Sequence, residues 1–335
     1  MEQYNIGIVG ASGAVGVEML ECLKNLDIPV KSLTLGGSAR SAGTTMHTPF
    51  GDVIVQEVND DFFNELDYAL FAAGGDISKK YAQIAVDKGT IVIDNSSAFR
   101  YDENVPLVIP QINGHTIKDA KIIANPNCTT AIAAVVLYPI YEKYGLNKIM
   151  MSTYQATSGA GAPGMQELLD NTQKYFSGDD PVVKQFSSNI AFNVIPHIDA
   201  FQENGYTKEE MKVVWETHKI FGDNSIDMSC TAVRTPTLRA HSESIILETK
   251  NPVNVADIKN ILDSASGVKL VDDIQNNLYP MPINASGNYD VEVGRIRKNL
   301  VFGDCGIELF VSGDQLLRGA ALNTVEILQT CITNK

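Results

Sequence analysis

A glycine-rich loop lies between the first two regular segments that the sequence predicts. Asn5–Val9 (NIGIV) has the apolar character of a buried strand, and Ala14–Asn25 carries apolar residues at helical spacing. The loop between them, Gly10–Gly16, is GASGAVG. Glycine permits the tight turn and the close backbone approach that a pyrophosphate needs at a helix start, although this spacing differs from GxGxxG. The pattern favours a dinucleotide-binding βα unit over a plain tight turn.

Short strand-like runs and helical runs continue to alternate through the first third of the chain. The predicted segments are strands at Ser32–Leu35, Val53–Val58, Tyr68–Ala72, Thr90–Ile93 and Lys121–Ala124, and a helix at Ile77–Asp87. Such alternation is typical of a parallel sheet covered by helices, although Val53–Val58 can also pair antiparallel. The first third is therefore expected to be an α/β domain.

The pattern changes at Asn125–Cys128 (NPNC). A long apolar helix is predicted over Thr129–Tyr144, with a break or kink near Pro139. The later strands indicate a larger sheet and are expected at Ile149–Tyr154, Val213–Thr217, Ser244–Thr249 and Leu300–Val311. Further helices are predicted at Val255–Ser264 and Gln315–Thr330. A chain of 335 residues suggests about two domains, with a compact boundary near residue 127.

Charge, cysteine usage and apolar runs narrow the class of protein. Lys and Arg total 26 against 40 Asp and Glu, whereas nucleic-acid binding usually leaves a basic surface. The N-terminus lacks signal-peptide features, and no apolar run approaches about 18 residues. We expect a cytoplasmic chain with reduced thiols, no nucleic-acid or membrane partner and no metal site. The cysteines are scattered, without disulfide or CxxC spacing, at Cys22, Cys128, Cys230, Cys305 and Cys331.

The segment after the second strand, Gly36–Gly43 (GGSARSAG), bears on the choice of cofactor. An NAD site usually places an Asp or Glu there to bond the ribose 2′-hydroxyl, and this segment has no acid. Ser38, Arg40 and Ser41 instead offer hydroxyls and a guanidinium suited to a 2′-phosphate. The alternative is a solvated arginine in a flexible loop. The absence of an acid favours NADP.

Cys128 differs from the other cysteines because it stands at the first turn of a long helix. Unpaired N–H groups and the helix dipole favour a thiolate there, and the same groups could stabilise an oxyanion. The alternative is a buried, inert cysteine, which is the interpretation given to Cys22 and Cys331. Cys128 is the candidate nucleophile.

A thiolate nucleophile needs a proton carrier, and His241 is the best candidate. It lies in a Pro-punctuated turn, Arg234–Ser242 (RTPTLRAHS), that leads into a strand. Arg234 and Arg239 suggest an anion pocket nearby. The alternative for a lone histidine is a purely structural role.

Six motifs together resemble those of aspartate-semialdehyde dehydrogenases, in the same order and over nearly the whole chain. They are GASGAVG at 10–16, SSAFR at 96–100, NPNCT at 125–129, YQATSGAG at 154–161, WETHKI at 215–220 and RTPTLRAHSE at 234–243. The resemblance implies a Rossmann-type domain joined to a mixed α/β domain like that of glyceraldehyde-3-phosphate dehydrogenase. It implies that residues 315–335 complete the cofactor domain of residues 1–127, and that residues 128–314 catalyse and dimerise. A homodimer or homotetramer is expected.

The resemblance also implies roles for single residues. Cys128 would be the nucleophile, His241 the acid/base and Gln155 the residue that orients the tetrahedral intermediate. The substrate residues would be Arg100, Lys219 and Asn127 for phosphate, Arg234 for the α-carboxylate and Glu216 for the α-ammonium. The cofactor residues would be Gly10, Ala11, Ser12, Gly13, Ala14, Val15, Ser38, Arg40, Ser41, Asn95, Ser158, Gly159 and Asn323. For Asn323 the alternative is an ordinary surface residue. In a strand Glu216 and Lys219 would face opposite ways, so a bend is required; alone, the pair would be interpreted as a surface ion pair.

The implied reaction is the NADPH-dependent conversion of aspartyl phosphate to aspartate semialdehyde and inorganic phosphate, in biosynthesis of the aspartate-derived amino acids lysine, threonine and methionine and of diaminopimelate. Two alternatives remain open. One is an N-acetyl-glutamyl-phosphate reductase, which would not need Glu216 to meet a free ammonium. The other is a non-catalytic paralogue, which would have no chemical reason to keep Cys128, Gln155 and His241 together.

Overall fold

The computed structural model describes residues 2–333, which fold into two compact units. The first unit contains the residues up to Asn127 together with those from Ala320 onward, and the second unit runs from Cys128 to Gly319. Residues 315–319, predicted to be part of the returning C-terminal helix, therefore belong to the second unit.

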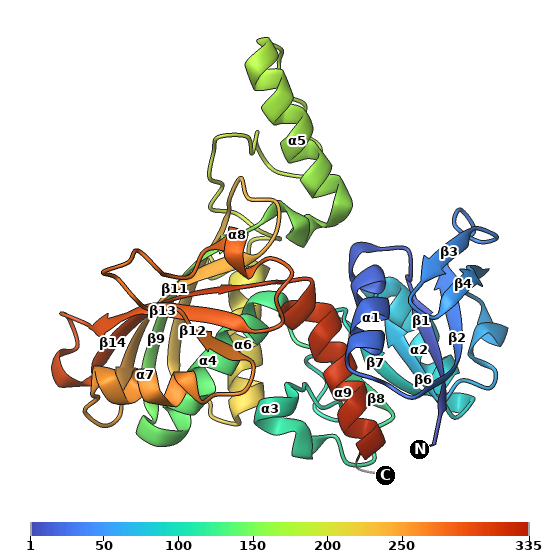
Figure 1. Cartoon of the computed structure of the whole chain (residues 1–335), viewed down its shortest axis with the longest axis horizontal. Helices are drawn as coiled ribbons and strands as arrows, with labels where there is room; N and C mark the ends of the chain where they lie inside the picture. Colours follow the sequence, from blue (N-terminus) through green and yellow to red (C-terminus); the bar gives the residue numbers. More distant parts are fainter. Residues whose placement is uncertain (1, 334–335) are drawn as a thin grey trace. The chain divides into compact units, whose positions relative to one another are not determined.

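The first unit is built on a six-stranded parallel sheet (Figure 1). Its strands, in sheet order, are β5 (Gln56–Glu57), β2 (Val30–Gly37), β1 (Tyr4–Val9), β6 (Tyr68–Phe71), β7 (Ile91–Asp94) and β8 (Ile122–Ala124). The strand order reverses between β1 and β6, which is the place where open α/β sheets bind ligands at the carboxyl ends of their strands. The glycine-rich loop follows β1 directly, so it lies at that place.

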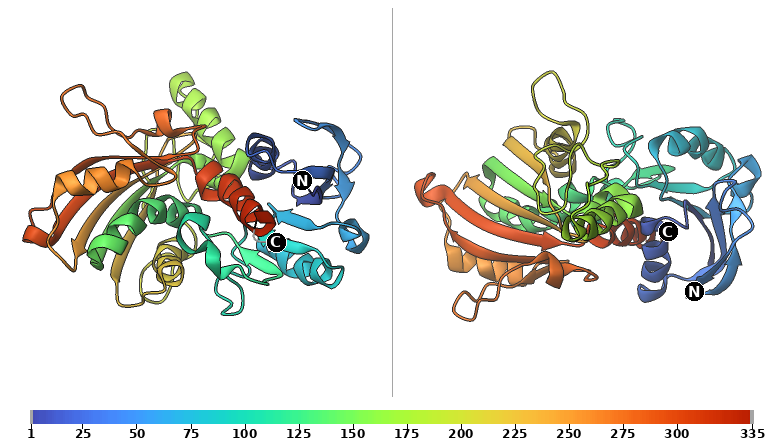
Figure 2. Two further views of the ribbon diagram at one scale, coloured as in Figure 1. Left: turned by 60° about the horizontal axis from the view of Figure 1, so that its bottom comes forward. Right: turned by 90° about the horizontal axis from the view of Figure 1, so that it is seen from above.

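Helices and an aromatic core cover this sheet. The helices are α1 (Ala14–Asn25), α2 (Gly75–Asp87), α3 (Pro110–Asn113) and α9 (Leu322–Thr333), with short 3-10 turns at Asp60–Phe63 and Gly114–Thr116. Figures 1 and 2 show α1 and α9 side by side, and α9 also contacts α3 and β7. Phe63 stacks on Phe71 with ring centroids 5.9 Å apart and also contacts Tyr81. The C-terminal helix is thus an integral layer of the first unit.

One predicted strand of the first unit is divided in the structure. Residues of Val53–Val58 contribute to β4 (Gly51–Ile54), which forms an antiparallel hairpin with β3 (Thr45–Thr48), and to β5, which pairs parallel with β2. The expectation of antiparallel pairing therefore holds for the first part of the segment only.

The second unit contains a six-stranded mixed sheet. Its strands, in sheet order, are β10 (Asp227–Arg234), β9 (Leu146–Gln155), β11 (His241–Thr249), β14 (Gly306–Gly313), β13 (Val291–Lys298) and β12 (Val268–Leu270). Helix α4 (Cys128–Tyr144) packs against four of these strands and continues through Pro139 without interruption. Helices α6 (Lys208–Phe221) and α7 (Val255–Asp263) pack against α4 and the sheet. The nearly all-round apolar character of α4 fits this central position.

The opposite face of the same sheet carries exposed apolar side chains. Met150 and Tyr154 on β9 are 41% and 40% exposed, and Tyr154 contacts Phe310 of β14 with ring centroids 6.1 Å apart. Strand residues alternate between faces, so these side chains point away from α4. We call the surface formed by Met150, Tyr154 and Phe310 the open face. Helix α5 (Gly161–Ser177) projects away from the body of the second unit (Figure 1).

Two predicted strands of the second unit were wrong in whole or part. Val213–Thr217 lies inside α6, which begins with a capping box formed by Thr207 and Glu210. The β-branched and aromatic residues of that segment suggested a strand, but the cap and the amphipathic spacing fix a helix. The predicted strand Leu300–Val311 begins only at Gly306, after an exposed turn. The sequence analysis did not predict α5, β10, β12 or β13.

Candidate active site

The predicted site residues are divided between the two units. The first unit holds Gly10, Ala11, Ser12, Gly13, Ala14, Val15, Ser38, Arg40, Ser41, Asn95, Arg100, Asn127 and Asn323. The second unit holds Cys128, Gln155, Ser158, Gly159, Glu216, Lys219, Arg234 and His241.

The glycine-rich loop forms a cradle that side chains would obstruct. Gly10 has φ +84°, and a Cβ there would lie 2.7 Å from the Ala72 carbonyl oxygen. A Cβ on Gly16 would lie 2.5 Å from the Gly10 carbonyl oxygen. Gly13 caps α1 without a side-chain hydrogen bond, so the first amides of the helix are not satisfied by a capping side chain. Such amides at a helix start favour an anionic group.

The turn after β2 presents the residues that were predicted to select the cofactor. Ser38 and Arg40 are exposed, and the Ser41 hydroxyl donates to the Ser38 carbonyl at 3.1 Å. That bond orders the turn but leaves the Ser41 oxygen able to accept a further hydrogen bond. The Arg40 guanidinium thus follows β2 at the place where an NAD site usually has an acidic side chain for the ribose 2′-hydroxyl.

Asn323 is fully buried in the first unit, so its interpretation as a surface residue is wrong. Its Nδ2 donates to the Val108 carbonyl at 2.9 Å and to Asn125 Oδ1 at 2.7 Å. Its own Oδ1 is buried and has no hydrogen-bond partner among residues 2–333. Beside it, Thr324 donates to Asn95 Oδ1 at 2.9 Å. A buried carbonyl oxygen without a donor suits an incoming amide N–H.

Arg100 braces two strand ends of the first unit. It is buried, with Nε donating to the Asn125 carbonyl at 2.9 Å and Nη2 donating to the Asn95 carbonyl at 2.8 Å. Asn127 is also buried, at the end of the same unit. Arg100 therefore has a positioning role that the sequence did not reveal, in addition to the phosphate role predicted for it.

Cys128 is the first residue of α4, and its side chain is partly exposed. This excludes the alternative of a fully buried cysteine, which describes Cys22 and Cys331. Gly319 packs closely against it, because a Cβ on Gly319 would lie 2.6 Å from the Cys128 Cβ. Cys128 therefore lies at the start of α4, and the side that faces Gly319 is covered by that glycine's backbone.

His241 begins β11 and is fully buried. Its Nδ1 accepts a hydrogen bond from the Ala156 N–H at 3.0 Å, which leaves the proton of the neutral ring on Nε2. Nε2 is buried without a hydrogen-bond partner among the described residues. Burial, and secondarily the charge of Arg234, lower the pKa of His241 to about 3. The ring is therefore neutral near pH 7, with one open N–H donor.

Arg234 ends β10 and converges with His241 on Gly159. A Cβ on Gly159 would lie 2.7 Å from Arg234 Nη1 and 3.3 Å from His241 Nε2. Arg234 Nη1 donates to the Ala156 carbonyl at 2.7 Å. Burial lowers the pKa of Arg234, and attraction to Glu209 and to Cys128 acts in the opposite direction. Within the second unit, Arg234 thus interacts electrostatically with Cys128 and with His241.

Arg239, the second arginine of this motif, forms an ion pair with Asp314. Its Nε donates to Asp314 at 2.6 Å, and the Asp314 carboxylate is fully buried. Arg234 is therefore the arginine of this motif that lies beside His241.

Gln155 is held by a residue that the sequence analysis missed. Its Oε1 accepts from Thr153 Oγ1 at 3.0 Å, and its Nε2 donates to Glu209 Oε1 at 3.1 Å. Glu209 is buried, and Lys212 donates to its other oxygen at 3.0 Å. The capping box at Thr207 was the available signal, because it places Glu209 in the first turn of α6.

Glu216 and Lys219 share one side of α6, because residues three apart on a helix are neighbours. Because the segment is a helix and not a strand, both side chains face the same side of it without the bend that a strand would have required. Glu216 is fully buried, and it lies two helical turns, about 10 Å, along the axis from Glu209. Glu209 is the acid that contacts Gln155.

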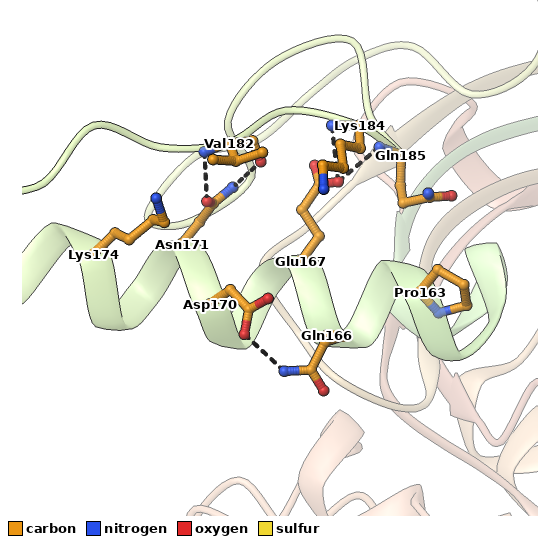
Figure 3. A pocket seen from close by; sticks show the side chains of 9 residues that line it. All are labelled: Pro163, Gln166, Glu167, Asp170, Asn171, Lys174, Val182, Lys184 and Gln185. Carbon is orange, nitrogen blue, oxygen red and sulfur yellow. Dashed lines mark hydrogen bonds between the residues drawn. The ribbon is translucent and has the colours of Figure 1, made fainter.

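The segment after α5 reaches the same arginine. Glu167 accepts from the backbone N–H groups of Lys184 and Gln185, and Asn171 exchanges two hydrogen bonds with Val182 (Figure 3). A pocket of about 310 Å³ lies between α5 and this segment, and its lining includes none of the predicted catalytic residues. Phe186 follows Gln185, which lines this pocket, and its ring lies 5.8 Å from the Arg234 guanidinium. The segment that includes residues 177–188 is therefore joined to α5 by hydrogen bonds and contacts Arg234 through Phe186.

Two negative findings apply to residues 2–333. No cluster of three or more His, Cys, Asp or Glu side chains in that range is arranged to hold a metal ion. No helix in it has both the length and the apolar character needed to cross a membrane.

Comparison with known proteins gives matches over nearly the whole chain. Residues 5–120 match the semialdehyde dehydrogenase NAD binding domain, and residues 137–318 match the semialdehyde dehydrogenase dimerisation domain. Aspartate-semialdehyde dehydrogenase from Shewanella violacea is 45% identical and covers 99% of this chain and 98% of its own. The enzyme of that name from Bacillus subtilis is 45% identical, with 97% and 96% covered. The crystal structure of aspartate semialdehyde dehydrogenase II complexed with ASA from Vibrio cholerae superposes with a TM-score of 0.96 at 42% identity, covering 99% of each chain.

Proposed function

Because the chain belongs to the aspartate-semialdehyde dehydrogenase family, we propose that it reduces 4-phospho-L-aspartate to L-aspartate 4-semialdehyde with NADPH, reversibly and through a thioester on Cys128. This reaction serves the biosynthesis of aspartate-derived amino acids. The observation that carries the proposal is the placement of Cys128 at the start of α4, in electrostatic reach of Arg234, with the open Nε2 of His241 beside the same arginine.

The residues of the second unit account for the covalent steps. The Cys128 thiolate, favoured by the α4 N-terminus and by Arg234, attacks the acyl carbon; the carbon–sulfur bond forms as phosphate leaves. NADPH, when bound, would supply the hydride that reduces the resulting thioester to a thiohemiacetal oxyanion. The Nε2–H of His241 donates to that oxyanion, which collapses to the aldehyde and restores the thiolate.

We propose the binding roles from the charge of each side chain and from the family motifs. Arg234 can hold the substrate α-carboxylate in a bidentate pair. Glu216 is proposed for the α-ammonium, and Arg100, Lys219 and Asn127 for the phosphate. Gln155, fixed by Thr153 and Glu209, orients the tetrahedral intermediate.

We propose that the first unit, which matches an NAD binding domain, binds NADP. The cradle at Gly10 and the start of α1 would receive the pyrophosphate, and Arg40 with Ser38 and Ser41 would receive the 2′-phosphate. The unpartnered Oδ1 of Asn323 would accept from the nicotinamide amide. Cofactor contacts are also proposed for the remaining loop residues and for Asn95, Ser158 and Gly159.

The direct assay follows reduced nicotinamide after the purified chain is mixed with aspartate semialdehyde, phosphate and NADP. We expect turnover that depends on all three. Parallel reactions with N-acetyl-glutamate semialdehyde should give no signal. Turnover with the acetylated substrate alone, or with neither, would refute the proposed substrate.

Replacing Arg40 with Ala should raise the Michaelis constant for NADP by about 10- to 100-fold, because charge-assisted bonds to the 2′-phosphate are lost. The Michaelis constant for NAD should change little. Initial rates at varied NADP and NAD measure both, and Lys31→Ala, an exposed change near the other end of β2, is the control. An equal effect on both cofactors would remove Arg40 from the 2′-phosphate role.

We further propose that the open face pairs two subunits. It lies within residues 137–318, which match a dimerisation domain, and it exposes apolar side chains on a sheet. Replacing Met150 with Glu should shift the chain from dimer toward monomer in sedimentation velocity. Ile54→Glu, at a more exposed apolar position in the first unit, should leave the dimer unchanged. A fully dimeric Met150→Glu variant would exclude this face.

A further inference from the structure

The turn that presents His241 contains a backbone conformation that alanine rarely adopts. Ala240 has φ +67°, in the left-handed region, and is fully buried. A side chain disfavours this region, so neighbouring contacts must hold the residue there. The direction of the His241 side chain depends on this conformation because the two residues are adjacent.

Gln315 supplies a contact that holds the turn. Its buried side chain accepts the Ala240 N–H at Oε1, at 2.8 Å, and donates from Nε2 to the Ser158 hydroxyl. The side-chain amide of Gln315 therefore links Ala240, which precedes His241, to Ser158, which precedes Gly159. Gly159 is the residue whose missing side chain leaves room for His241 Nε2.

The neighbouring residue anchors Gln315 itself. Asp314 Oδ2 accepts from Arg239 Nε and from the Gly287 N–H, each at 2.6 Å. Asp314 Oδ1 accepts from the Leu316 N–H at 2.9 Å. These bonds fix the end of β14, so Gln315 projects from a rigid support toward both loops.

We propose that Gln315 is a positioning residue for the reaction, which keeps His241 Nε2 in place against Gly159 by holding Ala240 and Ser158 together. The inference rests on the function proposed above, in which Nε2–H stabilises the oxyanion. It assigns Gln315 no contact with substrate. A displacement of about 1 Å at a reacting group can reduce turnover by as much as about 10²-fold.

The test compares three substitutions in the aspartate semialdehyde assay. Gln315→Leu removes both hydrogen bonds at similar size, Gln315→Asn is one methylene too short to span the loops, and Gln315→Glu keeps an acceptor for Ala240. We expect kcat to fall about 10- to 100-fold in the Leu and Asn variants, with Michaelis constants changed less than about threefold. The Glu variant should keep at least about tenfold more kcat than the Leu variant. Gln166→Leu, on the exposed side of α5, is the matched control.

The outcomes separate this inference from the proposed function. An unmutated chain without turnover would refute the function itself. A folded Leu or Asn variant with unaltered kcat would overturn the role of Gln315, as would a Glu variant no better than the Leu variant. If Gln315→Leu does not fold, the polar Asn variant decides the matter through its kcat and thermal midpoint.

Discussion

Replacing Cys128 with Ala is expected to reduce turnover by at least about 10³-fold while leaving NADP binding intact. The reason is that no thioester can form without the sulfur, and a thioester accepts hydride more readily than a carboxylate does. Steady-state rates measure the loss, and fluorescence titration with NADPH measures cofactor binding. The cradle that would hold the cofactor is built from residues of the first unit, whereas Cys128 belongs to the second.

A matched control is available in the same unit. Cys305 is also a partly exposed thiol, but it lies in a short 3-10 turn and not at the start of a long helix. Cys305→Ala should retain near-normal activity. If instead Cys128→Ala remains active, the thioester mechanism is wrong.

The second large effect is expected at His241. His241→Leu should lower kcat by about 10²- to 10⁴-fold with a smaller change in Michaelis constants, because the Nε2–H donor to the oxyanion is lost. His47→Leu, at an exposed hairpin of the first unit, should have little effect. A His241→Leu variant within about threefold of the unmutated chain would refute the donor role.

The pH profile gives an independent check on His241. Its pKa is lowered to about 3, so the charged ring forms only near and below that pH. Between pH 9 and pH 5 the ring stays neutral, and its donor is present throughout. The rate of the reduction step should therefore show no decline near pH 6.5 attributable to this histidine. An inflection near pH 6.5 that disappears in His241→Leu would contradict the lowered pKa.

Local signals in the sequence predicted the first unit well. The segment Tyr4–Asn25 combines an apolar strand, a glycine loop and a helix with apolar residues on one side, and α1 has the predicted bounds. Each of these signals acts within a few residues, so tertiary packing reinforces them and does not override them.

The error at Val213–Thr217 has the opposite origin. Its residues favour a strand when taken alone, whereas the helix is fixed by the Thr207 cap and by burial of one side of α6. Because the cap was overlooked, Glu209 was missed and Glu216 and Lys219 were placed on opposite faces.

Other parts of the site could not have been read from short motifs. Gln315 meets Ala240 and Ser158 across 75 and 157 residues of sequence, and Phe186, in the segment after α5, contacts Arg234. Such contacts depend on how distant strands are paired and how side chains fill the space between them. The motif residues Cys128 and His241 were recognisable, but the groups that hold them in place were not.

The most direct measurement of the central claim is a single turnover without phosphate. The chain is mixed with aspartate semialdehyde and NADP, and the reaction is quenched in acid and digested for mass spectrometry. We predict a rapid burst of about one NADPH per subunit, with an aspartyl group attached to the peptide that contains Cys128 and released by hydroxylamine. A burst with the acyl group on another residue, or steady NADPH formation with no acyl-enzyme, would contradict the account.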